Sequence, residues 1–297
     1  MSAAESRPQG PSLVVGYTGP PTGDDVLAFS RRWARSSGDR VVVASVHPGS
    51  APIGVGRVDA EWVAYLREES AQLLTEAESV LGTEVDASYR SVAADSASHG
   101  LHDLAEAESP GGALIVLGSR KTRGLRRTYP GSTAERLLQG APVAVALVPW
   151  GYGESAGEQL RRVAVAYIDT PDGQVALQHA AEIAQRLGAS LEVLSVVPDT
   201  RVVPALGDVA RFGEEQRAGY EQALEAAVAT LPSQLGATGR LLEGPVVDAL
   251  ADITPDQADL LICGSRGYGP ARRVLLGGVS SRVLRHARVP VLVVPRG

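Results

Sequence analysis

The chain has 297 residues, of which 44% are hydrophobic and 4% aromatic, and its formal net charge is −6 at pH 7. This length suits two cores of about 150 residues better than one, and the acidic balance argues against nucleic-acid binding. Cys263 is the single cysteine, which excludes an intrachain disulfide and a cysteine-cluster zinc site. Met1–Pro11 is polar and no long apolar run occurs, so we expect a cytoplasmic protein without a signal peptide or a membrane-spanning helix.

Strands and helices are expected to alternate along the first half of the chain. Short apolar runs predict strands, and apolar residues spaced three and four apart predict helices. Five strands are expected, at Leu13–Tyr17, Val41–Val46, Val85–Tyr89, Leu114–Leu117 and Val143–Val148. The helices expected between them are Asp24–Ser36, Trp62–Leu81, Leu101–Glu108 and Thr133–Leu138.

The second half of the chain repeats the first. Residues 13–48 align without a gap on residues 163–198, at an offset of 150, and residues 114–149 align on residues 260–295, at an offset of 146. Two long blocks in the same order indicate a duplication. The predicted domains are residues 11–150 and 160–297, and the glycine-rich, polar join Gly151–Glu158 is expected to be a flexible linker.

The second half therefore carries the same predicted elements. Its strands are expected at Val163–Tyr167, Leu191–Val197, Arg240–Leu242, Leu260–Cys263 and Val291–Val294, and its helices at Val175–Leu187, Gly213–Leu231, Val246–Ile253 and Ser280–His286. Strands that are apolar on both faces and separated by helices predict an α/β fold with two tandem doubly wound parallel sheets. In such sheets ligands bind beyond the carboxyl ends of the strands, where the strand order switches.

A glycine-rich loop follows the strand Leu260–Cys263. Gly264 and Gly267 would let backbone N–H groups approach an anion, and Gly277–Ser280 would begin a helix, whose free N–H groups favour phosphate. The loop therefore predicts a cradle for polyphosphate; the alternative is that these glycines only turn the chain. Arginines cluster in this loop and in its first-half counterpart, and they fit either phosphate neutralisation or a solvated loop: Arg120, Arg123, Arg126, Arg127, Arg266, Arg272 and Arg273.

The spacing Gly264-x2-Gly267-x9-Gly277 resembles the nucleotide loop of the universal stress protein family. The segment from Gly277 to Pro295 is also similar to that family, and the resemblance spans nearly the whole chain. It implies a five-stranded parallel sheet in each domain and antiparallel pairing of the two last strands within the chain. It also implies ATP or a related adenine nucleotide as the ligand, with Mg²⁺ as a companion ion. Whether two chains pair further into a homodimer is left open by the residues.

The resemblance assigns the nucleotide mainly to the second domain. The contacts it implies are the base against Val196, the ribose near Asp169, and the phosphates on Gly264, Gly267, Gly277, Val279 and Ser280. Two departures are present, since Gly278 stands where the family has Ser or Thr, and the family's aspartate column falls on Ile168, one residue before Asp169.

The first domain matches the nucleotide loop less well. Gly118, Gly131 and Ser132 fit the pattern, but Lys121 replaces the second glycine and Thr18 stands in the aspartate column. Lysine would place a Cβ and a long side chain where the backbone should approach a phosphate, although its charge could also attract one. We therefore expect nucleotide in the second domain rather than the first.

Three kinds of function fit these observations. The leading one is a stress-response binding and signalling module for an adenine nucleotide, and the second is an interaction protein that has lost its ligand. A slow ATPase has least support, because Asp169 is the single candidate for a base or a metal ligand. His99 and His102 lie three apart, as on one helical face, and are interpreted as solvated residues at a helix start rather than as a metal site. The Walker and dinucleotide fingerprints are absent.

Overall fold

The computed structural model describes residues 11–49, 58–108, 112–121, 128–154, 157–198, 209–265 and 278–295. The chain forms two compact units, each described here by itself. The first comprises Met1–Ser119 and Gly131–Gln159, and the second comprises Leu160–Gly297 together with Arg120–Pro130. Among the described helices, none is both long and apolar enough to cross a bilayer.

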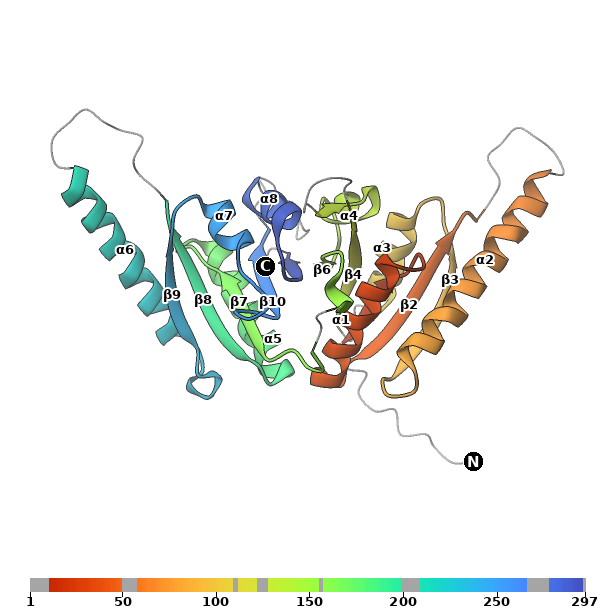
Figure 1. Ribbon diagram of the computed structural model, residues 1–297, viewed down its shortest axis with the longest axis horizontal. Helices are drawn as coiled ribbons and strands as arrows, with labels where there is room; N and C mark the ends of the chain where they lie inside the picture. Colours follow the sequence, from red (N-terminus) through yellow and green to blue (C-terminus); the bar gives the residue numbers. More distant parts are fainter. Residues whose placement is uncertain are drawn as a thin grey trace. The chain divides into compact units, whose positions relative to one another are not determined.

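The first unit holds five parallel strands in the order β3-β2-β1-β4-β6 (Figure 1). The strands are β1 Ser12–Gly16, β2 Arg40–His47, β3 Ala87–Ala93, β4 Ala113–Lys121 and β6 Ala144–Val148. The helices between them are α1 Thr22–Ser37, α2 Val58–Leu81, α3 Ala97–Glu108 and α4 Ser132–Leu137. Helix α1 packs beside α2, and α3 beside α4, which is the two-layer cover that right-handed crossovers give a sheet of this order.

The second unit repeats this arrangement, with parallel strands in the order β9-β8-β7-β10-β11. The strands are β7 Arg162–Ala166, β8 Ser190–Val197, β9 Thr238–Glu243, β10 Leu260–Gly264 and β11 Val291–Val294. The helices are α5 Pro171–Leu187, α6 Val209–Ala229, α7 Val246–Ala251 and α8 Gly278–His286. A short strand from the first half of the sequence, β5 Thr128–Pro130, packs against α8, where the Arg285 guanidinium lies 5.7 Å from the centre of the Tyr129 ring.

The predicted α/β fold with five parallel strands in each half is confirmed. The central strands follow the apolar runs, and residues such as Val14, Val42 and Ile115 are fully buried. The edge strand β3 differs, since it runs from Ala87 to Ala93 rather than from Val85 to Tyr89. Its residues are half-buried or exposed, so the apolar pattern does not mark it, and pairing with the whole of β2 sets its length.

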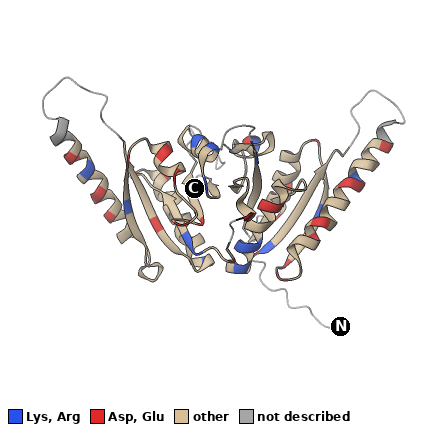
Figure 2. Cartoon of the chain, in the orientation of Figure 1, with Lys and Arg blue, Asp and Glu red and all other residues tan. Residues whose placement is uncertain are grey.

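Charged residues of both signs lie on the outer helices α2 and α6 (Figure 2). Arg217 on α6, for example, pairs with Glu221 one turn later at 3.0 Å. Exposed pairs of this kind add at most about 1 kcal/mol to stability. These charged residues form the solvent-facing side of the two long helices, and their ion pairs do not mark a binding site.

The join after β6 is docked on the first unit, so the expectation of a flexible linker is wrong for its first residues. Residues Tyr152–Glu154 form a 3-10 helix. The buried Asp25 carboxylate accepts hydrogen bonds from the backbone N–H groups of Gly151 and Gly153, both at 2.8 Å. Burial raises the pKa of Asp25, although these two bonds oppose the shift. The folded state thus holds the Asp25 proton more tightly than the unfolded state does. The free energy of unfolding therefore falls as the pH rises from the pKa of Asp25 in the unfolded state to its higher pKa in the folded state.

Replacing Asp25 by alanine is expected to lower the free energy of unfolding of the first unit by about 2 kcal/mol, because two N–H groups lose a charged acceptor. All three tryptophans, Trp33, Trp62 and Trp150, belong to the first unit, so their fluorescence during urea unfolding measures this change. The same variant should also be cut faster by a nonspecific protease between residues 150 and 160. The neighbouring exposed Asp24→Ala is the control, and equal cutting of the two variants would contradict the docking of the join.

Candidate functional site

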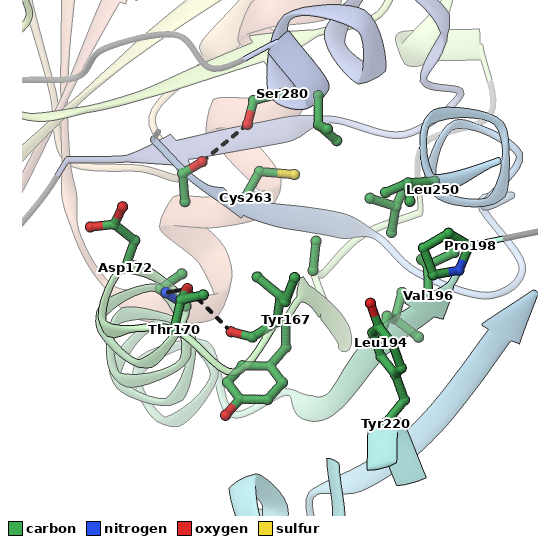
Figure 3. Close-up of a pocket in the computed structure, with 17 residues that line it drawn as sticks. Tyr167, Thr170, Asp172, Leu194, Val196, Pro198, Tyr220, Leu250, Cys263 and Ser280 are labelled. Atoms are coloured by element: carbon green, nitrogen blue, oxygen red, sulfur yellow. Dashed lines mark hydrogen bonds between the residues drawn. The ribbon is translucent and has the colours of Figure 1, made fainter. Parts of the chain in front are cut away.

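The second unit contains a cavity of about 280 Å³ at the carboxyl ends of β7, β8 and β10 (Figure 3). Strands β7 and β10 are neighbours in the sheet, but the chain leaves β7 towards β8 and reaches β10 from β9. The cavity therefore lies where the strand order switches, which is the ligand position expected for doubly wound sheets. Its volume is close to the lower end of the range for small-molecule sites, about 300 Å³.

The deep part of the cavity is apolar. Leu194 and Val196 line it from β8, Leu250 lines it from α7, and Cys263 lines it from β10. Burial raises the pKa of the Cys263 thiol to about 12, so the thiol stays protonated and behaves as a small apolar group. This part suits the flat, weakly polar portion of a ligand.

Two helices begin at the cavity. Thr170 caps α5, its hydroxyl oxygen accepting a 3.1 Å hydrogen bond from the Gly173 N–H. Val279 and Ser280, in the first turn of α8, also line the cavity, and the Ser280 hydroxyl donates to the Gly264 carbonyl oxygen at 3.0 Å. The first N–H groups of a helix have no partner within it and carry a partial positive charge, so this rim favours an anionic group.

The structure brings together around the cavity four of the residues proposed from the sequence: Val196, Gly264, Val279 and Ser280. Asp169 is not among the residues that line it. Its Oδ1 instead accepts hydrogen bonds from the Tyr167 hydroxyl at 3.2 Å and from the Gln174 amide at 3.4 Å. Burial, followed by the charge and hydrogen bond of Asp169, raises the pKa of Tyr167 to about 12.

A tight turn sets this position of Asp169. The N–H of Thr170 donates to the Ile168 carbonyl oxygen at 2.8 Å. That oxygen lies so close to Gly173 that a Cβ added there would be 1.9 Å from it. The turn is thus pressed onto the first turn of α5, and the two residues beside Asp169, Ile168 and Thr170, face the cavity instead.

Replacing Asp169 by asparagine is expected to lower the pKa of Tyr167, because the neighbouring negative charge is removed. A pH titration by NMR with labelled tyrosine measures this shift. Because the Asp169 carboxylate does not line the cavity, the same variant should change the affinity for ATP by less than about threefold. A loss of tenfold or more would show that the carboxylate reaches the ligand.

The Universal stress protein family matches this chain twice, over residues 12–149 and 159–295. The chain belongs to this family. A universal stress protein of Mycobacterium tuberculosis (strain ATCC 25618 / H37Rv) is 28% identical over 297 residues, covering 96% of this chain and 99% of the relative. The crystal structure of a universal stress protein from Archaeoglobus fulgidus DSM 4304 has a TM-score of 0.69 at 18% identity, covering 96% of this chain and 98% of that one.

A universal stress protein solved in complex with cAMP is also similar, over 46% of this chain with a TM-score of 0.31. A likeness of this size does not transfer a ligand to this chain. The comparisons therefore establish two tandem universal stress domains and their fold, and the ligand has to be argued from the cavity itself.

In the first universal stress domain, leucine side chains crowd the strand end that corresponds to the cavity. Leu117 and Gly16 are the counterparts of Cys263 and Ala166 in the second domain. A Cβ added to Gly16 would lie 2.7 Å from Leu117 Cδ2 and 2.9 Å from Leu101 Cδ1. The two leucines thus cover the end of β1, whereas the end of β7 opens into the cavity.

Thr22 and Val26 crowd the first domain further. A Cβ added to Gly118 would lie 2.4 Å from Thr22 Cγ2 and 2.9 Å from Val26 Cγ2. At Gly264, the counterpart of Gly118, the nearest atom is the Cβ of Ala176, at 3.3 Å. Gly131 and Ser132, predicted from the first-domain loop, stand at the start of α4, with Gly131 extended as its N-cap.

Several predicted residues lie outside the described part of the chain. These are Gly267, Gly277, Arg123, Arg126, Arg127, Arg266, Arg272 and Arg273, and the side chain of Lys121. Of the 17 residues that line the cavity, sequence reasoning named four; those it missed include Tyr220, Leu250 and Cys263. The signal for Cys263 was available, because the aligned halves place a small residue opposite Leu117.

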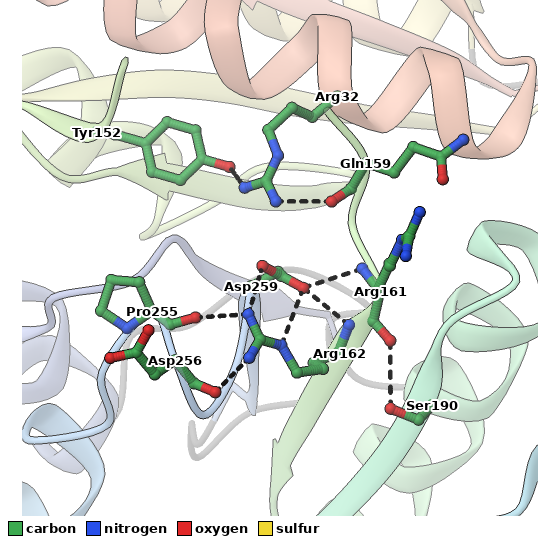
Figure 4. Close-up of polar contacts among 9 residues, drawn as sticks. All are labelled: Arg32, Tyr152, Gln159, Arg161, Arg162, Ser190, Pro255, Asp256 and Asp259. Atoms are coloured by element: carbon green, nitrogen blue, oxygen red, sulfur yellow. Dashed lines mark hydrogen bonds and ion pairs between the residues drawn. The ribbon is translucent and has the colours of Figure 1, made fainter. Parts of the chain in front are cut away.

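Buried charges elsewhere serve structure (Figure 4). In the first domain, Arg32 donates to the Tyr152 hydroxyl and, at 2.6 Å, to the Gln159 carbonyl oxygen. In the second domain, the Asp259 carboxylate accepts from the backbone N–H groups of Arg161 and Arg162, both at 2.9 Å. The Asp259 contacts hold the amino ends of β7 and β10, opposite the end that borders the cavity.

The histidine pair on α3 agrees with its interpretation as helix-start residues. The His99 N–H donates to the Ser96 hydroxyl oxygen at 3.2 Å, which is a helix-capping contact. His102, Asp103 and Glu106 bring their side-chain ligand atoms within 4.8 Å of one another, and both acidic residues are exposed. Such groups are common on solvated helix faces without a metal ion.

Proposed function

We propose that this universal stress protein binds ATP or a related adenine nucleotide in its second domain and acts as a binding and signalling module. The observation that carries the proposal is the cavity at the carboxyl ends of β7, β8 and β10. Its apolar depth suits a base, and the starts of α5 and α8 on its rim suit a phosphate. One site thus offers both kinds of contact that a nucleotide needs.

The difference between the domains supports a single site per chain. The positions that line the cavity in the second domain hold Ala166, Ala176 and Cys263, and their first-domain counterparts are Gly16, Val26 and Leu117. Side-chain atoms of Leu117, Leu101 and Val26 lie within 3 Å of where a Cβ on Gly16 or Gly118 would be, which leaves less room at these strand ends than in the second domain. This favours a structural or interaction role for the first domain.

A magnesium ion fits this site only together with the phosphates. Asp172 is the one acidic residue among the described residues that line the cavity. Mg²⁺ is commonly held by one or two carboxylates plus the phosphates of the substrate. Asp172 is therefore the residue that would approach such an ion, which would neutralise phosphate charge. The described cavity lining holds no second carboxylate for a metal-assisted hydrolysis.

Calorimetry with ATP, with and without magnesium, tests the proposal on three proteins. We expect the wild type to bind one nucleotide per chain, Gly267→Lys to bind none, and Lys121→Gly to bind as well as the wild type or better. The reason is that losing two backbone hydrogen bonds to a charged ligand costs about 3 kcal/mol, more than a hundredfold in affinity. If the wild type binds no adenine nucleotide, the interaction protein without a ligand becomes the better description. If Gly267→Lys binds as the wild type does, the phosphates lie elsewhere.

A further inference from the structure

One wall of the cavity comes from α6 through Tyr220, and the first domain has a serine at this position. Helices α2 and α6 correspond at the offset of 150 that relates β1 to β7, which places Ser70 opposite Tyr220. The burial of neighbouring residues supports this alignment, because small exposed fractions meet at equivalent positions: Leu74 (7%) and Leu224 (6%), Ala77 (0%) and Ala227 (2%).

In the first domain, Ser70 packs α2 against the sheet. It is 3% exposed, its hydroxyl donates to the Ser45 carbonyl oxygen at 3.2 Å, and it lies 3.0 Å from the Ser91 hydroxyl. In the second domain, Leu241 replaces Ser91 and offers no hydroxyl. The larger side chain of Tyr220 instead extends to the carboxyl end of β8, beside Val196 and Pro198 (Figure 3).

Tyr220 therefore completes an apolar slot. The end of β8 contributes Leu194, Val196 and Pro198, and α7 contributes Val246 and Leu250. An aromatic ring beside aliphatic side chains prefers a flat, polarisable partner, since rings stack in offset or edge-on arrangements. Every nucleobase has such a face, and stacking on it needs no particular hydrogen-bonding group.

We propose that Tyr220 recognises the base of the bound nucleotide by ring contact, which makes it the specificity-determining residue of this site for purine over pyrimidine nucleotides. The proposal rests on the proposed function of the cavity. A purine offers a larger ring face than a pyrimidine, so contact with Tyr220 and the slot gives purine nucleotides the higher affinity. The phosphates, at the starts of α5 and α8, contribute equally to both.

The test compares Tyr220→Ser, which copies the first domain, with Tyr220→Phe, which keeps the ring. Calorimetry of the full chain with ATP, CTP and inorganic tripolyphosphate gives three affinities for each protein. We expect Tyr220→Ser to weaken ATP about tenfold, to weaken CTP less, and to leave tripolyphosphate unchanged. Tyr220→Phe should hold ATP within about twofold of the wild type. Circular dichroism shows whether each variant keeps its fold.

Four results would overturn the inference, and the first three separate it from the function of the cavity. If Tyr220→Ser binds ATP as the wild type does, the cavity remains a nucleotide site but Tyr220 does not read the base. Equal losses for ATP and tripolyphosphate would place the effect on the phosphates or on the fold, and a matching loss in Tyr220→Phe would remove the role of the ring. Binding of none of the three compounds by the wild type would overturn the proposed function together with this inference.

Discussion

Replacing Cys263 by leucine is expected to weaken ATP binding more than a hundredfold while the second domain stays folded. The change copies Leu117 of the first domain, whose Cδ2 lies 2.7 Å from where a Cβ on Gly16 would be. The second domain already has a Cβ there, on Ala166, so the leucine side chain has to turn into the cavity. Overpacking of this kind costs about 1–3 kcal/mol of stability, and it removes the volume that the base needs.

Matched variants separate the effect of filling the cavity from the effect of removing the Cys263 thiol. Cys263→Ala removes the thiol without adding bulk, and it should bind ATP within about threefold of the wild type. Leu117→Ala in the first domain should cost about 2–5 kcal/mol of stability by opening a void. It should create no second ATP site, because Leu101 and Val26 still fill the space. Wild-type affinity in Cys263→Leu would show that the nucleotide does not enter this cavity.

The sequence alone predicted most of the fold because the central strands are buried on both faces. Runs such as Leu13–Tyr17 and Leu260–Cys263 are apolar at every position, and such runs are typical of parallel strands under two layers of helices. The duplicated blocks then carried the assignments within residues 13–48 and 114–149 to the second half. The edge strand β3 was predicted with the wrong bounds, because its half-exposed residues lack that pattern and its ends are set by pairing with β2.

Specific contacts, one distant in sequence and one local, decided what the sequence analysis missed. The polar, glycine-rich join looked flexible, yet Asp25, 126 residues earlier, binds the N–H of Gly151. Likewise, the position of Asp169 depends on the close approach of the Ile168 carbonyl oxygen to Gly173. Local composition carries no signal for either contact. Antiparallel pairing of the last strands, β6 and β11, stays a prediction, to be tested by light scattering on an isolated second half.

The candidate site was predictable where it depends on backbone. Val196, Gly264, Val279 and Ser280 lie around one cavity because strand ends and a helix start meet there in this topology. The choice between the two domains depends on side-chain volume instead. The aligned halves display Leu117 against Cys263, but the meaning of that difference follows only from the packing around Gly16.

Replacing Gly173 by alanine is expected to lower the free energy of unfolding of the second domain by about 3 kcal/mol. The added Cβ would lie 1.9 Å from the Ile168 carbonyl oxygen, and that contact involves backbone that cannot swing away. Relief requires the turn to move off α5, which also loosens the Thr170 cap, a contact worth about 1 kcal/mol by itself. Ile168 and Thr170 line the cavity, so ATP affinity should fall with stability.

The two domains can be observed separately in this experiment. All tryptophans belong to the first unit, so fluorescence follows the first domain, whereas circular dichroism follows the helices of both. Gly173→Ala should shift the transition seen by circular dichroism and leave the fluorescence transition in place. Gly219→Ala, in α6 with no atom within 4 Å of the added Cβ, is the control and should gain about 0.5–1 kcal/mol. Equal stability of the two variants would mean that the turn is not pressed onto α5, and the reason given for the position of Asp169 would fail with it.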